Sequence, residues 1–463
     1  GSGLYQVLED QYSGRIDQVI GSRQRMFGRF SRLTRADEFV PVFFPGLLSF
    51  PSEGQSDLGV SYRYFYSVAL DDTISFTPTL VGSLRYGLAY RNLPKLLGLA
   101  ADGRSLADPS VLNLPSIVLQ NQATKAFPIF NLADKNERFP QLGGRRDVEN
   151  WYTHTALATF YKMVGNHSLK FGTDYRLNRW NKIYLGDGQS GGFAFSSVFT
   201  QANPFVPSAA DTSGTALASL LLGVPDSGSL GYDSPLARQS HYLALFLQED
   251  WRVSPKLTLN FGVRYELETP YTERFNRAAS GFDYTASSPL KVPGLELRGG
   301  LRFAGAGGNP RREGNLDANN FGPRFGFAYS LGSKTVVRGG YGLFFGVQSY
   351  INSFDGAVGT FNAVTPYVGT IDAGATPLTS LVNPFPQGLR RPQGSEVGLA
   401  ARYGDSLSFF DQYRVNPYNQ QWQFSLQREL PGGSVLEAAY VGMLSLKLLE
   451  SFNLNEKPDV YLA

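Results

Sequence analysis

The sequence predicts an all-β protein: a large antiparallel transmembrane β-barrel with short periplasmic turns and long extracellular loops. Two observations predict this fold. Long segments alternate between apolar and polar residues, with the period of two that a β-strand gives its side chains. Short turns rich in Gly, Asn, Asp and Pro alternate with long, poorly periodic connectors, as in an outer-membrane barrel. The 51 Gly and the aromatic content of 14% also favour strands and turns over helices.

The alternation is clearest in residues 257–268, LTLNFGVRYELE. Every second residue from Leu257 to Leu267 is apolar, and the residues between them are small, polar or charged. The stretch is about twice as long as a usual soluble strand, and about 10–12 tilted residues cross the hydrocarbon core of a membrane. We therefore expect its apolar face to contact lipid and its polar face to line a wet lumen.

About six hairpins of this kind follow one another along the chain. Their predicted turns lie at Gly21-Ser22, Asp71-Asp72, Gly165-Asn166, Ser254 to Lys256, Gly332-Ser333 and Pro431 to Gly433. These residue types adopt the backbone angles that tight turns require. The long connectors run over about 34–58, 92–150, 181–239, 269–317 and 347–415. We expect about 12 strands. We also expect residues 1–463 to be part of one transmembrane β-barrel domain.

The alternation assigns individual residues to each face. The predicted lumen-facing residues are Arg85, Asn260, Arg264, Glu266, Arg324, Arg338 and Gln423. The predicted lipid-facing residues are Leu257, Leu259, Phe261, Val263, Phe325, Phe327, Leu343 and Phe424. A large soluble β-sandwich or propeller also alternates, and it is the alternative fold that the pattern leaves open.

Composition excludes several classes of protein. The chain has no Cys, so disulfides, Cys-ligated zinc and thiol catalysis are excluded. The net charge of only +3 does not indicate a nucleic-acid-binding protein. The sequence contains no run of 18 apolar residues, so it predicts no transmembrane helix.

Residues that could carry chemistry are few. His154, His167 and His241 are far apart in the sequence, so we interpret them as interfacial or solvated side chains. Glu249-Asp250 and Glu266/Glu268 could be catalytic carboxylates, but lumen or rim charges matched by Arg252 and Arg264 are the favoured interpretation. The RGGYG segment at 338–342 lies within a predicted strand, so it fails as a phosphate loop. We predict no enzyme activity, no cofactor, and no catalytic, cofactor-binding or metal residues.

Aromatic residues and loops supply further expectations. An aromatic girdle is expected from residues near the ends of the predicted strands: Trp151, Trp180, Trp251, Trp422, Tyr242, Tyr271 and Tyr329. Ordinary core aromatics are the alternative. Residues 215–225, TALASLLLGVP, predict a short helix packed into the loops, with a ligand contact as the alternative. Residues 307–315, GGNPRREGN, predict a solvated basic loop, with lipopolysaccharide phosphates as a further contact.

Several segments also resemble a known family, the Oar-like TonB-dependent outer-membrane receptors that are abundant in Acidobacteria and Myxobacteria. The segments are QEDWRVSPKLTLNFGVRYELETPYTERFNR, DANNFGPRFGFAYSLGSKTVVRGGYGLFF and NPYNQQWQFSLQRELPGGSVLEAAYVG, with weaker similarity from about residue 5 to 456. The resemblance implies a barrel of about 22 strands, preceded by a plug and a carboxypeptidase-regulatory-like domain. It also implies import of a large nutrient or chelate, driven through the plug by the inner-membrane TonB complex.

No plug, regulatory-like domain or TonB box is recognisable in residues 1–463, so we expect the chain to be a segment of a longer polypeptide. The expected location is the bacterial outer membrane. The expected partners are outer-membrane lipid and lipopolysaccharide, an unknown ligand, and the TonB complex acting through the plug; nucleic acid is not expected. A passive porin-like channel and a structural or adhesive surface barrel are the alternative functions.

Overall fold

The computed structural model describes residues 4–40, 61–94, 112–119, 128–133, 146–185, 191–205, 213–232, 234–346, 360–404, 407–451 and 453. Twelve long strands form one sheet in which strands adjacent along its path pair antiparallel. They are β1 (Leu4–Ile20), β2 (Gln24–Val40), β3 (Ser61–Thr77), β4 (Leu80–Pro94), β6 (Arg146–Val164), β7 (His167–Leu185), β10 (Leu236–Ser254), β11 (Leu257–Glu268), β15 (Asn320–Ser330), β16 (Thr335–Phe345), β18 (Tyr418–Glu429) and β19 (Val435–Leu446). The predicted fold class and the expected number of strands are confirmed.

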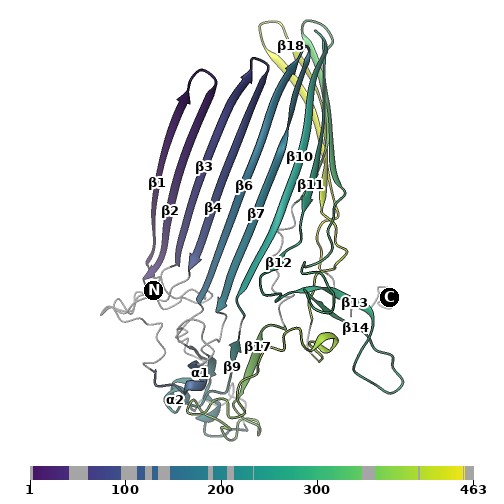
Figure 1. Ribbon diagram of the computed structural model, residues 1–463. Coiled ribbons are helices and arrows are strands. Elements are labelled where there is room, and N and C mark those ends of the chain that lie inside the picture. Colours follow the sequence, from purple (N-terminus) through teal and green to yellow (C-terminus); the bar gives the residue numbers. More distant parts are fainter. Residues whose placement is uncertain are drawn as a thin grey trace.

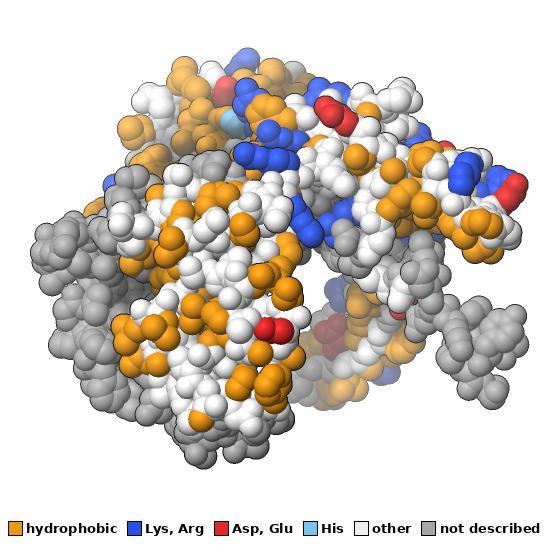
Figure 2. Space-filling model, turned by 90° about the horizontal axis from the view of Figure 1, so that it is seen from below, with side chains coloured by type: hydrophobic (Ala, Val, Ile, Leu, Met, Phe, Trp, Pro, Cys, Tyr) orange, Lys and Arg blue, Asp and Glu red, His pale blue; other side chains and the backbone are white. Residues whose placement is uncertain are grey.

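The short turns and the long connectors lie at opposite ends of the sheet (Figure 1). We call these the turn end and the loop end. The strands follow the order of the chain across the sheet, so each hairpin is a neighbour of the next. The sheet is curved and open: among the described residues, β1 pairs only with β2, and β19 pairs only with β18. Seen from the loop end, the molecule curves around a gap (Figure 2).

One predicted turn is wrong. Asp71 and Asp72 lie within β3, and the hairpin turns instead at Pro78 and Thr79. Asp71 is tolerated inside the strand because Arg85 of β4, its direct cross-strand neighbour, pairs with its carboxylate. Asp and Asn often mark turns, but an ion pair across two strands can hold an Asp within a ladder.

The connectors contain structure of their own at the loop end. The short strands β5 (Ile129–Leu132), β8 (Gly192–Phe195), β9 (Ser227–Tyr232) and β17 (Ala363–Val368) form a second sheet. Phe193, Phe195 and Leu230 are almost fully buried at its centre. The helices α1 (Ser116–Leu119) and α2 (Ala216–Leu221) contribute Val118 and Ala216 to the same core. The helix predicted at 215–225 is therefore confirmed, and Thr215 caps it by accepting a hydrogen bond from the backbone amide of Ala218.

A smaller hairpin completes the loop end. Its strands are β13 (Ala279–Ser287) and β14 (Arg298–Phe303), and Leu301 and Phe303 pack there with Phe361 from another connector. The two-residue strand β12 (Thr272–Glu273) continues the chain beyond β11 and pairs with β10. No helix in the described part of the chain is long and apolar enough to cross a membrane.

The separation of the two ends predicts opposite exposure in cells. We expect the turn end to face the periplasm and the loop end to face the outside. Lys256→Cys lies in the turn after β10, and Glu296→Cys lies between β13 and β14, at a side chain that is 87% exposed. An impermeant thiol reagent added to intact cells should label position 296 and leave position 256 unlabelled. Because the sequence has no native Cys, the background is clean; labelling of 256 alone would reverse the orientation.

Candidate functional site

The register of the strands sorts their side chains onto two faces. What we call the polar face carries all seven residues predicted to face a lumen: Arg85, Asn260, Arg264, Glu266, Arg324, Arg338 and Gln423. What we call the apolar face carries all eight residues predicted to face lipid: Leu257, Leu259, Phe261, Val263, Phe325, Phe327, Leu343 and Phe424. The structure thus groups the two sets on opposite sides of one sheet. Which side meets lipid belongs to the proposal below.

Charged residues from four strands fall in one transverse row of the polar face. They are Asp71, Arg85, Asp174 and Glu266. The Nε of Arg85 donates to Oδ2 of Asp71 at 2.7 Å, and two hydroxyl groups also donate to this buried carboxylate. Each carboxylate in the row has a donor within the sheet. Arg176 and Arg264, which lie outside the row, pair with Asp174 and Glu266 and bring the local charge into balance.

Arg264 is the centre of a hydrogen-bonded network on this face. Its Nε donates to Oε1 of Glu266 at 2.6 Å, and its Nη2 donates to Oδ2 of Asp174 at 3.1 Å. The same nitrogen donates to the Tyr242 hydroxyl at 3.0 Å, and that hydroxyl donates to Glu266. Arg176 also pairs with Asp174, at 2.7 Å. The network joins two guanidinium groups and two carboxylates from β7 and β11 with a tyrosine hydroxyl from β10. Such a network fixes their positions more firmly than separate pairs would.

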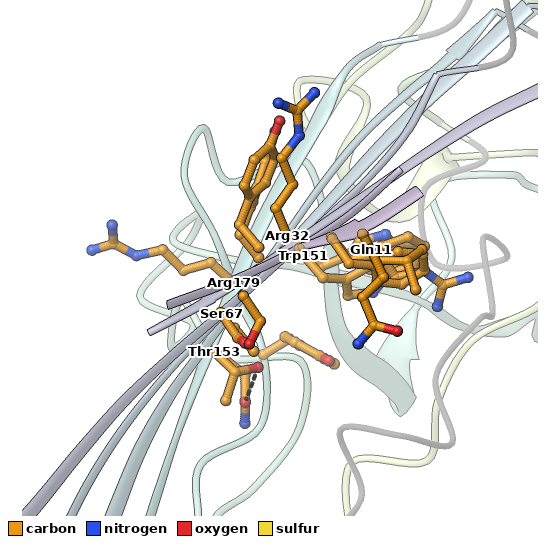
Figure 3. Close-up of a pocket in the computed structure, with 16 residues that line it drawn as sticks. Gln11, Arg32, Ser67, Trp151, Thr153 and Arg179 are labelled. Carbon is orange, nitrogen blue, oxygen red and sulfur yellow. Dashed lines mark hydrogen bonds between the residues drawn. The ribbon is translucent and has the colours of Figure 1, made fainter. Parts of the chain in front are cut away.

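An aromatic shelf lies on the polar face nearer the loop end. The rings of Trp151 in β6 and Trp180 in β7 stack with centroids 6.3 Å apart. The guanidinium of Arg91 lies 4.7 Å from the centroid of Trp151 and 5.7 Å from that of Phe65. These side chains line a pocket of about 630 Å³, which Tyr271 and residues of β1 and β2 complete. In Figure 3, Gln11 and Trp151 point to one side of the sheet, whereas Arg32 and Arg179 point to the other.

This shelf corrects part of the aromatic girdle expected from the sequence. Trp251, Trp422 and Tyr329 lie on the apolar face, as a girdle requires. Trp151, Trp180 and Tyr242 lie on the polar face, and Tyr271 follows β11 outside the main sheet. The alternation in the sequence gave one indication that Trp151 lies on the polar face, because it places Trp151 on the same face as Thr153 and Thr155. The indication was weak, because the opposite face of β6 also mixes polar and aromatic residues.

A buried ion pair anchors the loops to the end of the sheet. The Nε of Arg238 in β10 lies 3.0 Å from Oε1 of Glu313, and both side chains are fully buried. Arg414, from a second connector, donates to the backbone carbonyl of Glu313 at 2.9 Å. Burial raises the pKa of the Glu313 carboxyl, although Arg238 and Arg414 act in the opposite direction. The 307–315 segment is therefore only partly the solvated loop that its composition predicts, because Glu313 holds it against β10.

The remaining ionisable residues do not converge. In the described part of the chain, no group of three or more His, Asp or Glu side chains is placed to hold a metal ion. Glu249 is not matched by Arg252 as expected; it lies on the apolar face, where its carboxylate contacts Nδ1 of His167. His154 and His241 each share a hydrogen bond with a tyrosine hydroxyl at 2.9 Å, on the same face.

A curved wall with one apolar and one charged face, and with its long loops at one end, is typical of a membrane barrel. The sequence matches the family model described as the outer membrane beta barrel domain over residues 4–462. The chain therefore belongs to the outer-membrane β-barrel domain family and is a protein of the bacterial outer membrane. The family is defined by a membrane barrel and not by a catalytic domain. No curated protein matches the sequence.

Solved structures resemble the chain in fold. The outer membrane transporter YddB from Escherichia coli is 12% identical with a TM-score of 0.49; the match covers 94% of this chain and 40% of YddB. The ferric yersiniabactin uptake receptor FyuA from Yersinia pestis is 10% identical with a TM-score of 0.43, covering 95% and 45%. The Serratia marcescens hemophore receptor HasR is also 10% identical, with a TM-score of 0.42 and coverage of 94% and 45%. The chain spans less than half the length of these proteins.

The two faces predict different costs for a buried charge. Leu259→Lys places an ammonium on the apolar face near the turn end of β11, which should destabilise the membrane-inserted protein by about 1–2 kcal/mol, between the costs at the midplane and at the interface. Asn260→Lys, one residue further on, should cost much less, because Asn260 already donates to Asp250 and that carboxylate would pair with the new charge. Denaturant titrations in lipid vesicles measure both. Equal costs would mean that the two faces meet the same solvent.

The buried anchor predicts a local effect at the loop end. Glu313→Gln leaves Arg238 charged and buried without its carboxylate, which should cost about 3–5 kcal/mol of loop stability. Faster proteolysis within 269–317 is the expected result. Glu296→Gln is the matched control, because the Arg298–Glu296 pair is exposed and such pairs contribute little. If both variants are cleaved at the wild-type rate, the pair does not hold the loop.

Proposed function

We propose that this chain forms part of the wall of a plugged, TonB-dependent outer-membrane transporter of the Oar-like type, and that the transporter imports a large nutrient or chelate. The family match supports an outer-membrane barrel. The resemblance of the hairpin segments to Oar-like receptors supports the finer assignment. In this proposal the polar face lines the lumen and the apolar face meets lipid.

The observation that carries the proposal is the polar face itself, which extends over twelve strands. An eight-stranded barrel is filled by its own side chains, whereas larger barrels enclose a channel or a plugged lumen. Glycines recur on this face, among them Gly262, Gly326 and Gly340. They keep the wall thin, so that a lumen of this width has room for a hydrated domain.

The ion-pair network suits contact with such a plug. Arg264 and Arg176 balance the carboxylates of Glu266 and Asp174, so a hydrated domain can lie against them without burying an unpaired charge. The plug would in turn connect the barrel to the inner-membrane TonB complex. The apolar face would contact outer-membrane lipid and lipopolysaccharide.

The aromatic shelf is the proposed first contact for the ligand. It lies where the loops meet the sheet, and Trp151, Trp180 and Phe65 supply flat apolar surface while Arg91 supplies a cation. Pockets that combine aromatic walls with a few polar groups are typical binding sites for small molecules. The ligand itself is left open by this arrangement.

Conductance tests the proposal against a passive channel. Residues 1–463 alone should give no stable ion conductance in a planar bilayer, because β1 and β19 would expose unpaired backbone groups to lipid. A heat-resistant barrel that conducts ions without any added segment would replace the proposal with a passive porin.

Thiol labelling in the native outer membrane provides a second test of the proposal. A bulky thiol reagent should label Gln423→Cys slowly, and faster after mild urea loosens a plug inside the barrel. Immediate labelling without urea indicates an open channel. A lumen that stays closed in urea, with no energy-dependent uptake in cells, indicates a structural or adhesive barrel.

A further inference from the structure

A transverse row of tyrosine and arginine side chains crosses the apolar face of six strands. The register pairs each member with the next, from β1 through β7: Tyr12, Arg32, Tyr66, Tyr90, Tyr152 and Arg179. We call this the Tyr–Arg row. Arg32, Tyr66, Tyr90 and Arg179 also border the pocket at the aromatic shelf. The register nevertheless places their side chains on the opposite face from Trp151 and Trp180, as Figure 3 shows for Arg32 and Arg179.

The three central tyrosines form a continuous surface. The rings of Tyr66 and Tyr90 stack with centroids 5.8 Å apart, and those of Tyr90 and Tyr152 are 4.7 Å apart. The Arg32 guanidinium lies 5.9 Å from the Tyr66 centroid and donates to Thr34. Arg179 is exposed at the other end of the row. Among the described residues, neither arginine forms an ion pair with a carboxylate.

The position of the row along the strands matches one boundary of a membrane. On β6, the apolar face runs from Tyr152 to Lys162 through His154, Ala156, Ala158 and Phe160. Ten residues at about 3.3 Å each, tilted by about 40°, span roughly 25 Å, which is the height of the lipid-facing band of an outer-membrane barrel. The Tyr–Arg row is on the loop-end side of this band. In the expected orientation Tyr152 therefore lies at the level of outer-leaflet headgroups, and the row, which runs perpendicular to the tilted strands, crosses that region obliquely.

An apolar groove lies on the same face, nearer the turn end. Its volume is about 550 Å³, and its floor is made of small residues, Gly28, Ala156 and Ala158. Leu70 and Tyr86 rise beside this floor. Gly28 is four residues from Arg32 along β2, or about 13 Å. A headgroup at the row would thus place an acyl chain over the groove.

We propose that the Tyr–Arg row and this groove form a binding site for one lipopolysaccharide molecule of the outer leaflet. Charge complementarity favours this occupant. Arg32 and Arg179 are two unpaired cations separated by about four strand spacings, roughly 19 Å, and lipopolysaccharide carries several phosphates on a broad sugar headgroup. The tyrosines between them offer flat rings to the sugars and hydroxyl groups to the phosphates. The groove takes one of the acyl chains.

Lipid that co-purifies with the protein extracted from native outer membranes, with every segment that completes the barrel, tests the site. The double variant Arg32→Gln/Arg179→Gln should retain about tenfold less lipopolysaccharide after detergent washing, because charge-assisted hydrogen bonds to phosphate are lost. Native mass spectrometry and assay of hydroxy fatty acids measure the amount. Arg428→Gln is the control, because Arg428 is an exposed arginine on the same face at the turn end. Equal retention by wild type and double variant overturns the proposal, as does an equal loss in the control.

A second variant tests the groove separately. Ala158→Phe fills the floor of the groove and leaves both arginines in place. It should lower lipopolysaccharide retention by several fold without changing heat-modified gel migration, which reports folding. Purified protein exchanged into vesicles with phosphatidylglycerol or with lipopolysaccharide identifies the lipid. Preferential retention of phosphatidylglycerol would show that a phospholipid, and not lipopolysaccharide, occupies the site.

Discussion

The structure depends on one constraint: each peptide group within the membrane needs a hydrogen-bond partner inside the protein, because hydrocarbon offers none. The antiparallel ladder meets this need for the strands between its two edges, β1 and β19. Once the backbone is paired in this way, successive side chains must alternate between the two faces. The two-faced pattern of residues 257–268 is the direct result.

Because side chains alternate along a strand, each strand must suit two different surroundings, one on each face. Leu259 and Phe261 are suited to lipid, and Asn260, Gly262 and Arg264 between them are suited to water. Charges on the polar face are tolerated because neighbouring strands place a counter-charge directly opposite or one step away, as Arg85 does for Asp71. On the apolar face, aromatic rings cover glycines of the next strand: Phe327 lies against Gly339, and Trp422 lies against Gly442. These contacts fill space that a glycine leaves empty in the ladder.

The sequence predicts the sheet well and the loops poorly, for physical reasons. Alternation is a local signal, so the strands and the two sets of face residues were accessible without any knowledge of tertiary contacts. The turn at Pro78 was missed because Asp71-Asp72 has turn chemistry, and only the cross-strand position of Arg85 explains its place in a strand. The Arg238–Glu313 pair joins residues 75 positions apart in separate segments, and no local pattern marks such a pair. The parallel pairing of β5 with β8 is nonlocal for the same reason.

Strand length explains where the binding features lie. The strands β6, β7 and β10 have 19 residues each, whereas β11, β15 and β16 have 11 or 12. A 19-residue strand is about 63 Å long, well beyond what the hydrocarbon core requires, so the longer strands continue past the apolar band at the loop end. At that level, neighbouring residues serve opposite faces: Trp151 and Trp180 form the shelf, while Tyr152 and Arg179 belong to the Tyr–Arg row. One short stretch of each strand therefore serves the pocket on the polar face and the Tyr–Arg row on the apolar face. The same register fixes the positions of the aromatic shelf and of the proposed headgroup site relative to each other.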